Sequence, residues 1–298
     1  MNLNISSMAN EKVGGSLLIT GTARSGTTIV GKLVHSFKNV DLSYEPPLLL
    51  SLMSLIHTMD EMEWRLLYET YLYEDFYLGA MAGRSLNTNQ VDDSSIFRVK
   101  TQAEVNRRLT SSLKKSNFEG SGIRSMLAWK TPDLIPFLGK LIEYYPKMHT
   151  VIVKRNAIET INSLIQKGWF SNERNNKNEI WPFILNKNHC IPFWVKPEDY
   201  DFWINVSELD RCAYYYIRMN DSLEKLDSVI EIKYSKLLES PYGVTKTLSE
   251  KLGLEFGEMT QDIIGTVEAS NVTRNMSLIS KITSELRGKV EYYSELSE

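Results

Sequence analysis

Short apolar runs alternate along this chain with segments in which apolar residues recur at helical spacing. Strands are predicted at residues 16–20, 39–43, 126–130, 149–153 and 228–232. Helices are predicted at residues 26–37, 133–145 and 157–167, and within the stretch 48–115. Because strands that alternate with helices pack as a parallel sheet covered by those helices, the pattern predicts an α/β fold with a central parallel β-sheet.

Residues 168–206 depart from this alternation, since they are rich in asparagine and aromatic residues and show no clear period. The aromatic residues are Trp169, Phe170, Trp181, Phe183, Phe193, Trp194 and Trp203. We interpret residues 1–298 as a single domain in which this stretch is an insertion that binds a ligand. Core packing is the alternative explanation for its aromatic side chains.

Composition and charge narrow the class of protein. The chain has 298 residues and a net charge of −3, which is ordinary for a globular protein and argues against a nucleic-acid partner. Its two cysteines and four histidines show no metal-binding spacing, so no metal site is predicted. The longest apolar stretch, residues 46–56, is shorter than the roughly 18 residues of a membrane helix. We therefore expect no membrane span and a cytoplasmic location.

The strongest local motif is the turn between the first predicted strand and helix, residues 21–28, with the sequence GTARSGTT. Gly21 and Gly26 permit a tight turn in which backbone N–H groups and the positive helix terminus converge on an anion. Thr27 stands where a nucleotide-hydrolysing P-loop carries lysine, so the positive charge comes instead from Arg24. The motif predicts a phosphate-binding loop in a P-loop-type three-layer domain. A strand-to-helix turn without a ligand is the alternative.

A second basic group follows the predicted strand at residues 149–153. Arg155 stands at the carboxyl end of this strand, and Ser163 lies eight residues later in the next predicted helix. A guanidinium and a hydroxyl in these places can hold one phosphate group, because arginine forms forked, charge-assisted hydrogen bonds. A surface ion pair and an ordinary helix serine are the alternative interpretation.

Together the two motifs resemble the cofactor site of sulfotransferases that use 3′-phosphoadenosine 5′-phosphosulfate (PAPS). The loop is similar to their 5′-phosphosulfate-binding loop. Arg155 with Ser163 resembles their 3′-phosphate signature, although the usual proline is Ala157 here. A third similar segment, residues 230–254, contains Tyr234 at a strand end. The resemblance implies PAPS as the sulfuryl donor, without a required metal, bound by Arg24, Ser25, Gly26, Thr27, Thr28, Arg155, Ser163 and Arg274.

Sulfuryl transfer needs a base for the acceptor hydroxyl and positive charge near the transferred group. Lys130 precedes Thr-Pro in a segment that resembles the Lys-x-Pro stretch of tyrosylprotein sulfotransferases, which implies that Lys130 and Arg24 stabilise the transition state. Glu45 follows the second predicted strand, as the base does in those enzymes, so we expect Glu45 to take the acceptor proton. Asp41 and Asp133 are weaker candidates for this role.

The C-terminal segment, residues 268–298, contains a further match. Ser270 and Arg274 resemble the Ser-x-Val-x-Arg segment of tyrosylprotein sulfotransferases, which implies that Ser270 aids the transition state and Arg274 approaches the cofactor. We expect this segment to close over the cofactor. A charged, polar surface is the alternative.

The sequence thus favours a PAPS-dependent sulfotransferase that acts by in-line displacement on a hydroxyl of a small-molecule or carbohydrate acceptor. Two other classes stay open. A P-loop kinase or nucleoside triphosphatase would need an acidic Mg²⁺ ligand at a strand end, where this chain has Lys154 and Arg155. A non-catalytic nucleotide-binding protein of the same fold is the other class, because a fold does not fix a function.

Overall fold

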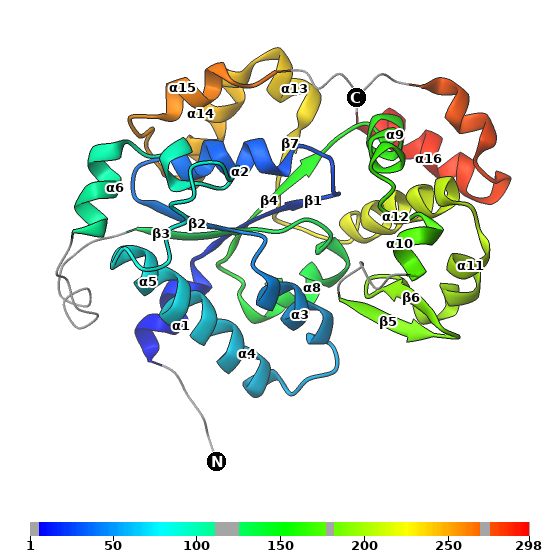
Figure 1. The fold of residues 1–298 in the computed structure, drawn as a ribbon, viewed down its shortest axis with the longest axis horizontal. Helices are drawn as coiled ribbons and strands as arrows, with labels where there is room; N and C mark the ends of the chain where they lie inside the picture. The colour runs from blue at the N-terminus through cyan, green and yellow to red at the C-terminus, as the bar shows by residue number, and fades with distance from the viewer. Residues whose placement is uncertain (1–5, 111–124, 177–181, 269–274, 298) are drawn as a thin grey trace.

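The computed structural model describes residues 6–110, 125–176, 182–268 and 275–297. Five parallel strands form its central sheet in the order β2-β3-β1-β4-β7 (Figure 1). They are β1 (Leu17–Gly21), β2 (Val40–Tyr44), β3 (Met126–Lys130), β4 (His149–Lys154) and β7 (Ile230–Lys233). Each corresponds to a predicted strand, so the predicted α/β fold with a parallel sheet is confirmed.

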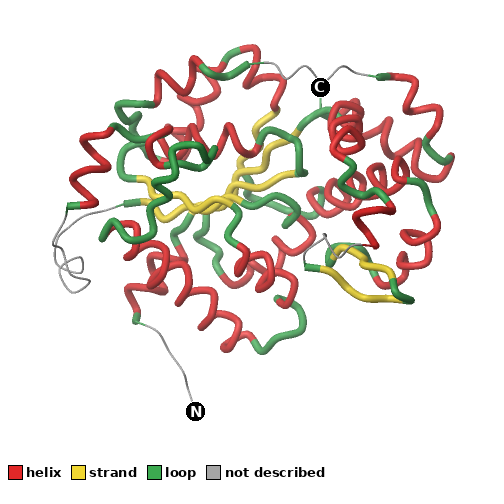
Figure 2. The backbone as a smooth tube through the Cα atoms, in the orientation of Figure 1, coloured by secondary structure: helices red, strands yellow, loops and turns green. Residues whose placement is uncertain are grey.

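Helices cover both faces of this sheet and give the molecule three layers (Figure 2). One face carries α2 (Thr27–Ser36), α6 (Gln102–Leu109), α13 (Tyr234–Glu239), α14 (Pro241–Leu252) and α15 (Thr260–Gly265). The other carries α1 (Ser7–Gly14), α3 (Pro47–Leu55), α4 (Glu61–Glu69), α8 (Leu138–Tyr144), α9 (Ala157–Lys167) and α12 (Glu208–Leu223). Each face of the sheet has its own hydrophobic core. Leu17 and Ile19 of β1 point into the core beneath α2, and Leu18 points into the core on the opposite face, because side chains of a strand alternate between its two faces.

The helix-rich stretch predicted between residues 48 and 115 has two parts. The helix α4 continues into the π-helix η1 (Thr70–Tyr77) and α5 (Leu78–Met81), whereas the 3₁₀-helix η2 (Ile96–Arg98) and α6 come later. Residues 82–95 between them form no helix. Here Asn87, Asn89 and Asp92 accept hydrogen bonds of 2.7–3.2 Å from backbone N–H groups two residues ahead. Such local bonds compete with helix formation.

Residues 168–206 contain short elements around an aromatic core. Strands β5 (Phe183–Asn186) and β6 (His189–Pro192) form an antiparallel hairpin, and α10 (Asn172–Asn176) and α11 (Tyr200–Asn205) flank it. Phe170, Trp194 and Trp203 are buried against one another, and the first two also contact Tyr215 of α12. At these three positions the aromatic residues form core packing.

The C-terminal part contains η5 (Met276–Lys281) and α16 (Ser284–Leu296), and α16 packs against α9 and α12. The Thr283 backbone N–H donates to the Asp210 carboxylate at 2.9 Å. Arg287 of α16 donates to the carbonyl oxygens of Ser280 and Ile282 at 3.0 and 2.8 Å, so it links α16 to the end of η5. Within the described ranges, none of the helices combines the length and apolar character needed to span a bilayer.

Candidate active site

The predicted site residues lie where the central strands end, at the carboxyl edge of the sheet. Arg24 is in the loop after β1, Glu45 follows β2, Lys130 ends β3, and Arg155 follows β4. Tyr44 is paired in register with Lys130, which places the following Glu45 beside the end of β3. Open α/β sheets bind their ligands at this edge.

The loop between β1 and α2 has the backbone of an anion cradle. Arg24 and Gly26 have φ angles of 67° and 100°. A Cβ at Gly26 would lie 2.5 Å from the Tyr234 ring, so only glycine fits there. No side chain of the described ranges caps the start of α2, which leaves its first N–H groups open to a ligand. Ser25 Oγ is buried and has no hydrogen-bond partner in the part of the chain that the structure describes.

Two arginines and a serine from three segments converge beside this loop. Arg24 Nε donates to Ser163 Oγ at 3.0 Å, and Arg155 Nη1 donates to the Arg24 carbonyl oxygen at 3.1 Å. The Arg155 guanidinium lies over the Tyr234 ring, 4.9 Å from its centroid. Arg155 Nε also donates to Glu159 Oε2 at 2.9 Å. The structure therefore brings the predicted pair Arg155 and Ser163 together with Arg24 in one cationic corner that can hold a phosphate.

Glu45 and Lys130 form an ion pair at the ends of adjacent strands. The Lys130 ammonium also donates to Thr28 Oγ1 at 3.2 Å, which links β3 to the first turn of α2. The Glu45 N–H donates to the Lys130 carbonyl oxygen at 2.7 Å, and Glu45 has a φ of 46°, a strained angle for a residue other than glycine. The Lys130 side chain is 3% exposed and that of Glu45 is 55% exposed, so molecules from solvent reach the carboxylate first.

Asp133 holds the loop between β1 and α2 through hydrogen bonds to its backbone. Its carboxylate accepts hydrogen bonds from the Tyr215 hydroxyl and, at 3.3 Å, from the Ala23 backbone N–H. The Asp133 N–H donates to the Gly21 carbonyl oxygen at 3.1 Å. Burial raises the pKa of Asp133 to about 6, and the nearby charge of Glu45 acts in the same direction, whereas the hydrogen bonds from Tyr215 and Ala23 oppose the shift. These contacts give Asp133 a structural role at the loop.

Asp41, the other weaker candidate for the base, is buried inside the sheet. It forms an ion pair with Arg108 and accepts a hydrogen bond from Ser125 Oγ at 2.8 Å. Burial opposes its ionisation, but the Arg108 charge and the hydrogen bonds from Arg108 and Ser125 lower its pKa overall. A carboxylate held in this way is unsuited to taking a proton from a substrate.

Sequence reasoning and structure differ in which residues they assign to the site. Ser270 and Arg274 lie outside the described residues. Tyr234 and Glu159 contact Arg155, although neither was predicted as a site residue. The position of Glu159, four residues after Arg155 on the next helix, was the available signal for the ion pair. The contact of Tyr215 with the loop had no signal in the sequence, because 192 residues separate it from Ala23.

The residues present fit PAPS. Two guanidinium groups, an open helix N-terminus and the unpartnered Ser25 hydroxyl meet at one loop, and this donor set suits phosphate and sulfate oxygens. Among the described residues, no group of three or more histidine, cysteine, aspartate or glutamate side chains is placed to hold a metal ion.

Comparisons relate the chain to known proteins. The sequence profile of a family described as the sulfotransferase family matches residues 16–258. The sulfotransferase domain of the Synechococcus PCC 7002 olefin synthase has 14% identity and a TM-score of 0.48, with 94% of this chain and 93% of that chain covered. The sulfotransferase domain from the curacin biosynthetic pathway has 12% identity and a TM-score of 0.47, with 95% and 96% covered. Sulfotransferase STF1 from Mycobacterium tuberculosis H37Rv has 14% identity and a TM-score of 0.40, with 95% and 78% covered. No curated protein matches the chain.

Proposed function

The chain belongs to the sulfotransferase family, and we propose that it transfers the sulfuryl group of PAPS to a hydroxyl of a small-molecule or carbohydrate acceptor. The reaction is an in-line displacement that forms a sulfate ester and releases adenosine 3′,5′-bisphosphate (PAP). One observation carries the proposal: Lys130 lies between the exposed carboxylate of Glu45 and the first turn of α2. A base and a cation thus meet at the end of the phosphate loop.

Donor binding falls to the loop and the cationic corner. PAPS supplies an activated sulfuryl group whose leaving group is a phosphate. The backbone N–H groups of residues 26–28 and the Arg24 guanidinium bind the 5′-phosphosulfate, and Arg155 with Ser163 binds the 3′-phosphate. The hydrogen bond from Arg24 to Ser163 supports this division, because it positions the two sets of phosphate-binding groups against each other.

Proton removal falls to Glu45, whose carboxylate takes the proton of the acceptor hydroxyl. Lys130 and Arg24 stabilise the negative charge that grows on the leaving phosphate. In the structure the Lys130 ammonium is paired with Glu45.

Two further segments complete the proposed enzyme. Residues 168–206 contribute to acceptor binding through side chains outside the aromatic core. Ser270 and Arg274 aid transfer and closure over the cofactor, as the family resemblance implies. The sequence contains two cysteines, Cys190 and Cys212, too few for a disulfide scaffold, which suits the reducing, cytoplasmic compartment in which we place the reaction.

Isothermal titration with PAP tests the donor site directly. We expect metal-independent binding that weakens about 10-fold to 100-fold in Arg155→Ala, as for loss of a charge-assisted phosphate contact. Lys154→Ala is the matched control, because Lys154 is the neighbouring cation but pairs with Glu231 on β7. Binding of ATP with Mg²⁺ and not of PAP would contradict the proposal. Once PAP binding is established, incubation with labelled PAPS and a panel of hydroxylated acceptors tests whether the sulfuryl group is transferred.

A further inference from the structure

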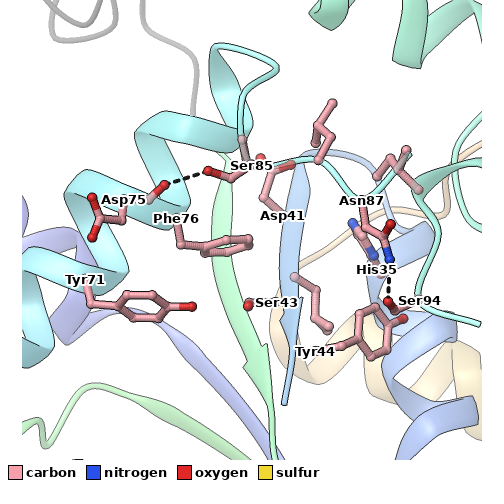
Figure 3. Close-up of a pocket in the computed structure, with 14 residues that line it drawn as sticks. His35, Asp41, Ser43, Tyr44, Tyr71, Asp75, Phe76, Ser85, Asn87 and Ser94 are labelled. Atoms are coloured by element: carbon pink, nitrogen blue, oxygen red, sulfur yellow. Dashed lines mark hydrogen bonds between the residues drawn. The ribbon is translucent and has the colours of Figure 1, made fainter. Parts of the chain in front are cut away.

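A cavity of about 360 Å³ lies along the outer side of β2, the strand that precedes Glu45 (Figure 3). Since β2 is an edge strand of the sheet, one side of its backbone faces away from the other strands. In Figure 3, Ser43 of β2 lies between two walls. Tyr71 and Phe76 of η1 form one wall, and Asn87 and Ser94 belong to the other.

Hydrogen bonds hold both walls in place. Ser85 Oγ donates to the Asp75 carbonyl oxygen at 2.7 Å, and Asn87 Nδ2 donates to Ser94 Oγ at 2.8 Å. The Ile96 N–H donates to the Asn87 carbonyl oxygen at 2.8 Å. The first wall is a π-helix, a conformation that recurs at functional sites. The cavity is thus an ordered feature of the fold.

Two polar side chains that line this cavity lack hydrogen-bond partners. His35 Nδ1 and the Tyr44 hydroxyl are both buried, and neither has a partner among the residues that the structure describes. Burial lowers the pKa of His35 to about 3, so its ring is neutral and offers one donor and one acceptor. These two side chains give the cavity a polar lining beside β2, which suits a polar ligand.

The chemistry of the lining selects the class of ligand. None of the described residues that line the cavity is a lysine or arginine, and the lining includes Asp75, so an anion is disfavoured. Serine, asparagine and tyrosine side chains offer donors and acceptors, while Tyr71 and Phe76 offer ring surfaces. A neutral ring molecule with several hydroxyl groups matches this combination.

We propose that the cavity binds a sugar unit of the acceptor, an inference that rests on the proposed function. Ser43 and Tyr44 line the cavity, and Glu45 follows them directly at the end of β2. Two residues of extended chain span roughly 7 Å, so a sugar seated against Ser43 lies close to the base. The cavity then determines which hydroxyl group reaches Glu45.

Saturation-transfer difference NMR on the full chain with PAP present tests this proposal, with glucose, galactose and N-acetylglucosamine as probes. Asn87→Trp fills the cavity from its wall. Thr88→Trp is the matched control, because Thr88 is the exposed neighbour and does not line the cavity. We expect at least one sugar to bind to the wild type and to Thr88→Trp, and its affinity to fall at least about tenfold in Asn87→Trp, from lost wall contacts.

Each outcome separates this proposal from the proposed function. If PAP binds and none of the three sugars does, the sugar site is overturned and the donor site stands. Equal sugar binding in Asn87→Trp and the wild type also overturns it, because the sugar then sits elsewhere. Sugar binding without PAP binding overturns the proposed sulfotransferase function, whereas the assignment of the cavity as a sugar site is retained. If Asn87→Trp fails to bind PAP, Ser94→Leu replaces it, since it changes the same wall by a smaller side chain.

Discussion

Lys130 places its buried ammonium against the exposed carboxylate of Glu45, at the ends of two adjacent strands. The cation is fixed from the other side by Thr28. The pair therefore has an inner, immobile member and an outer member that an incoming hydroxyl can meet. This division suggests separate tests for the two residues.

Glu45→Gln removes the base and keeps the shape of the side chain. We expect the turnover number to fall about 10²-fold to 10⁴-fold, as for loss of general base catalysis, with PAP affinity close to that of the wild type. Turnover of labelled PAPS and titration with PAP measure the two quantities. Glu61→Gln, an exposed glutamate on α4, is the control. A comparable loss in Glu61→Gln, or full activity in Glu45→Gln, would rule out the assigned base.

Lys130→Met removes the ammonium and keeps an aliphatic stem of similar length. We expect turnover to fall about 10²-fold to 10³-fold, because a cation aimed at the developing charge is lost. Thermal stability should change little, since Glu45 is exposed enough to be hydrated alone. Lys140→Met, at a partly exposed lysine of α8, should leave turnover unchanged. A Lys130→Met enzyme that is fully active but unstable would assign Lys130 a purely structural role.

Gly26→Ala and Gly288→Ala should shift stability in opposite directions. At Gly26 a Cβ meets the Tyr234 ring and φ is 100°, so we expect a loss of about 2–4 kcal/mol together with loss of PAP binding. At Gly288, inside α16, a Cβ meets no atom within 4 Å, so alanine should add about 0.5–1 kcal/mol. Urea unfolding measures both changes. Equal stabilities of the two variants would refute the assigned geometry of the loop.

Asp133→Asn should change how stability depends on pH. The folded protein holds the Asp133 proton up to a pH of about 6, whereas the ordinary value is 3.8. Between these values the unfolded chain binds fewer protons, so this carboxyl makes the free energy of unfolding fall as pH rises. Asparagine cannot ionise, so the variant should lack this decline, which amounts to at most about 3 kcal/mol.

Urea unfolding at pH 4 and pH 7 checks this prediction. The free energy of unfolding of Asp133→Asn, relative to that of the wild type, should be higher at pH 7 than at pH 4. Asp201→Asn, at an exposed aspartate paired with Lys187, is the control and should show no such trend. A constant difference between the Asp133 variant and the wild type would mean that Asp133 titrates normally.

The sequence predicted the sheet well because its strands are short, apolar and followed by helices. It missed α12 and α16, whose polar faces obscure the helical period, although Ser207 accepts the capping bond from the Asp210 N–H at 3.1 Å. The resemblance to sulfotransferases, which rested on the loop at residues 21–28, on Arg155 with Ser163 and on residues 230–254, is confirmed by the family match.

The candidate site was predictable only where a motif is local. Arg24, Glu45 and Lys130 lie at or just after strand ends, so their meeting at one edge follows from parallel topology. The ring of Tyr215 behind the loop depends on how α12 packs, and no local pattern encodes such packing. The cavity beside β2 depends in the same way on the path of residues 82–95, whose turns come from Asx hydrogen bonds and not from a motif.

Tyr215 joins two regions that the chain keeps far apart. Its hydroxyl accepts a hydrogen bond from the Ala23 N–H of the phosphate loop, while its ring packs on Phe170 and Trp194. A molecule that binds residues 168–206 and displaces this ring must therefore alter the affinity of the loop for its nucleotide. By thermodynamic reciprocity the nucleotide alters the affinity for that molecule by the same factor. A substitution in the aromatic core that changes how firmly Tyr215 is held should therefore change the coupling between the two binding affinities, although it lies far from every reacting atom.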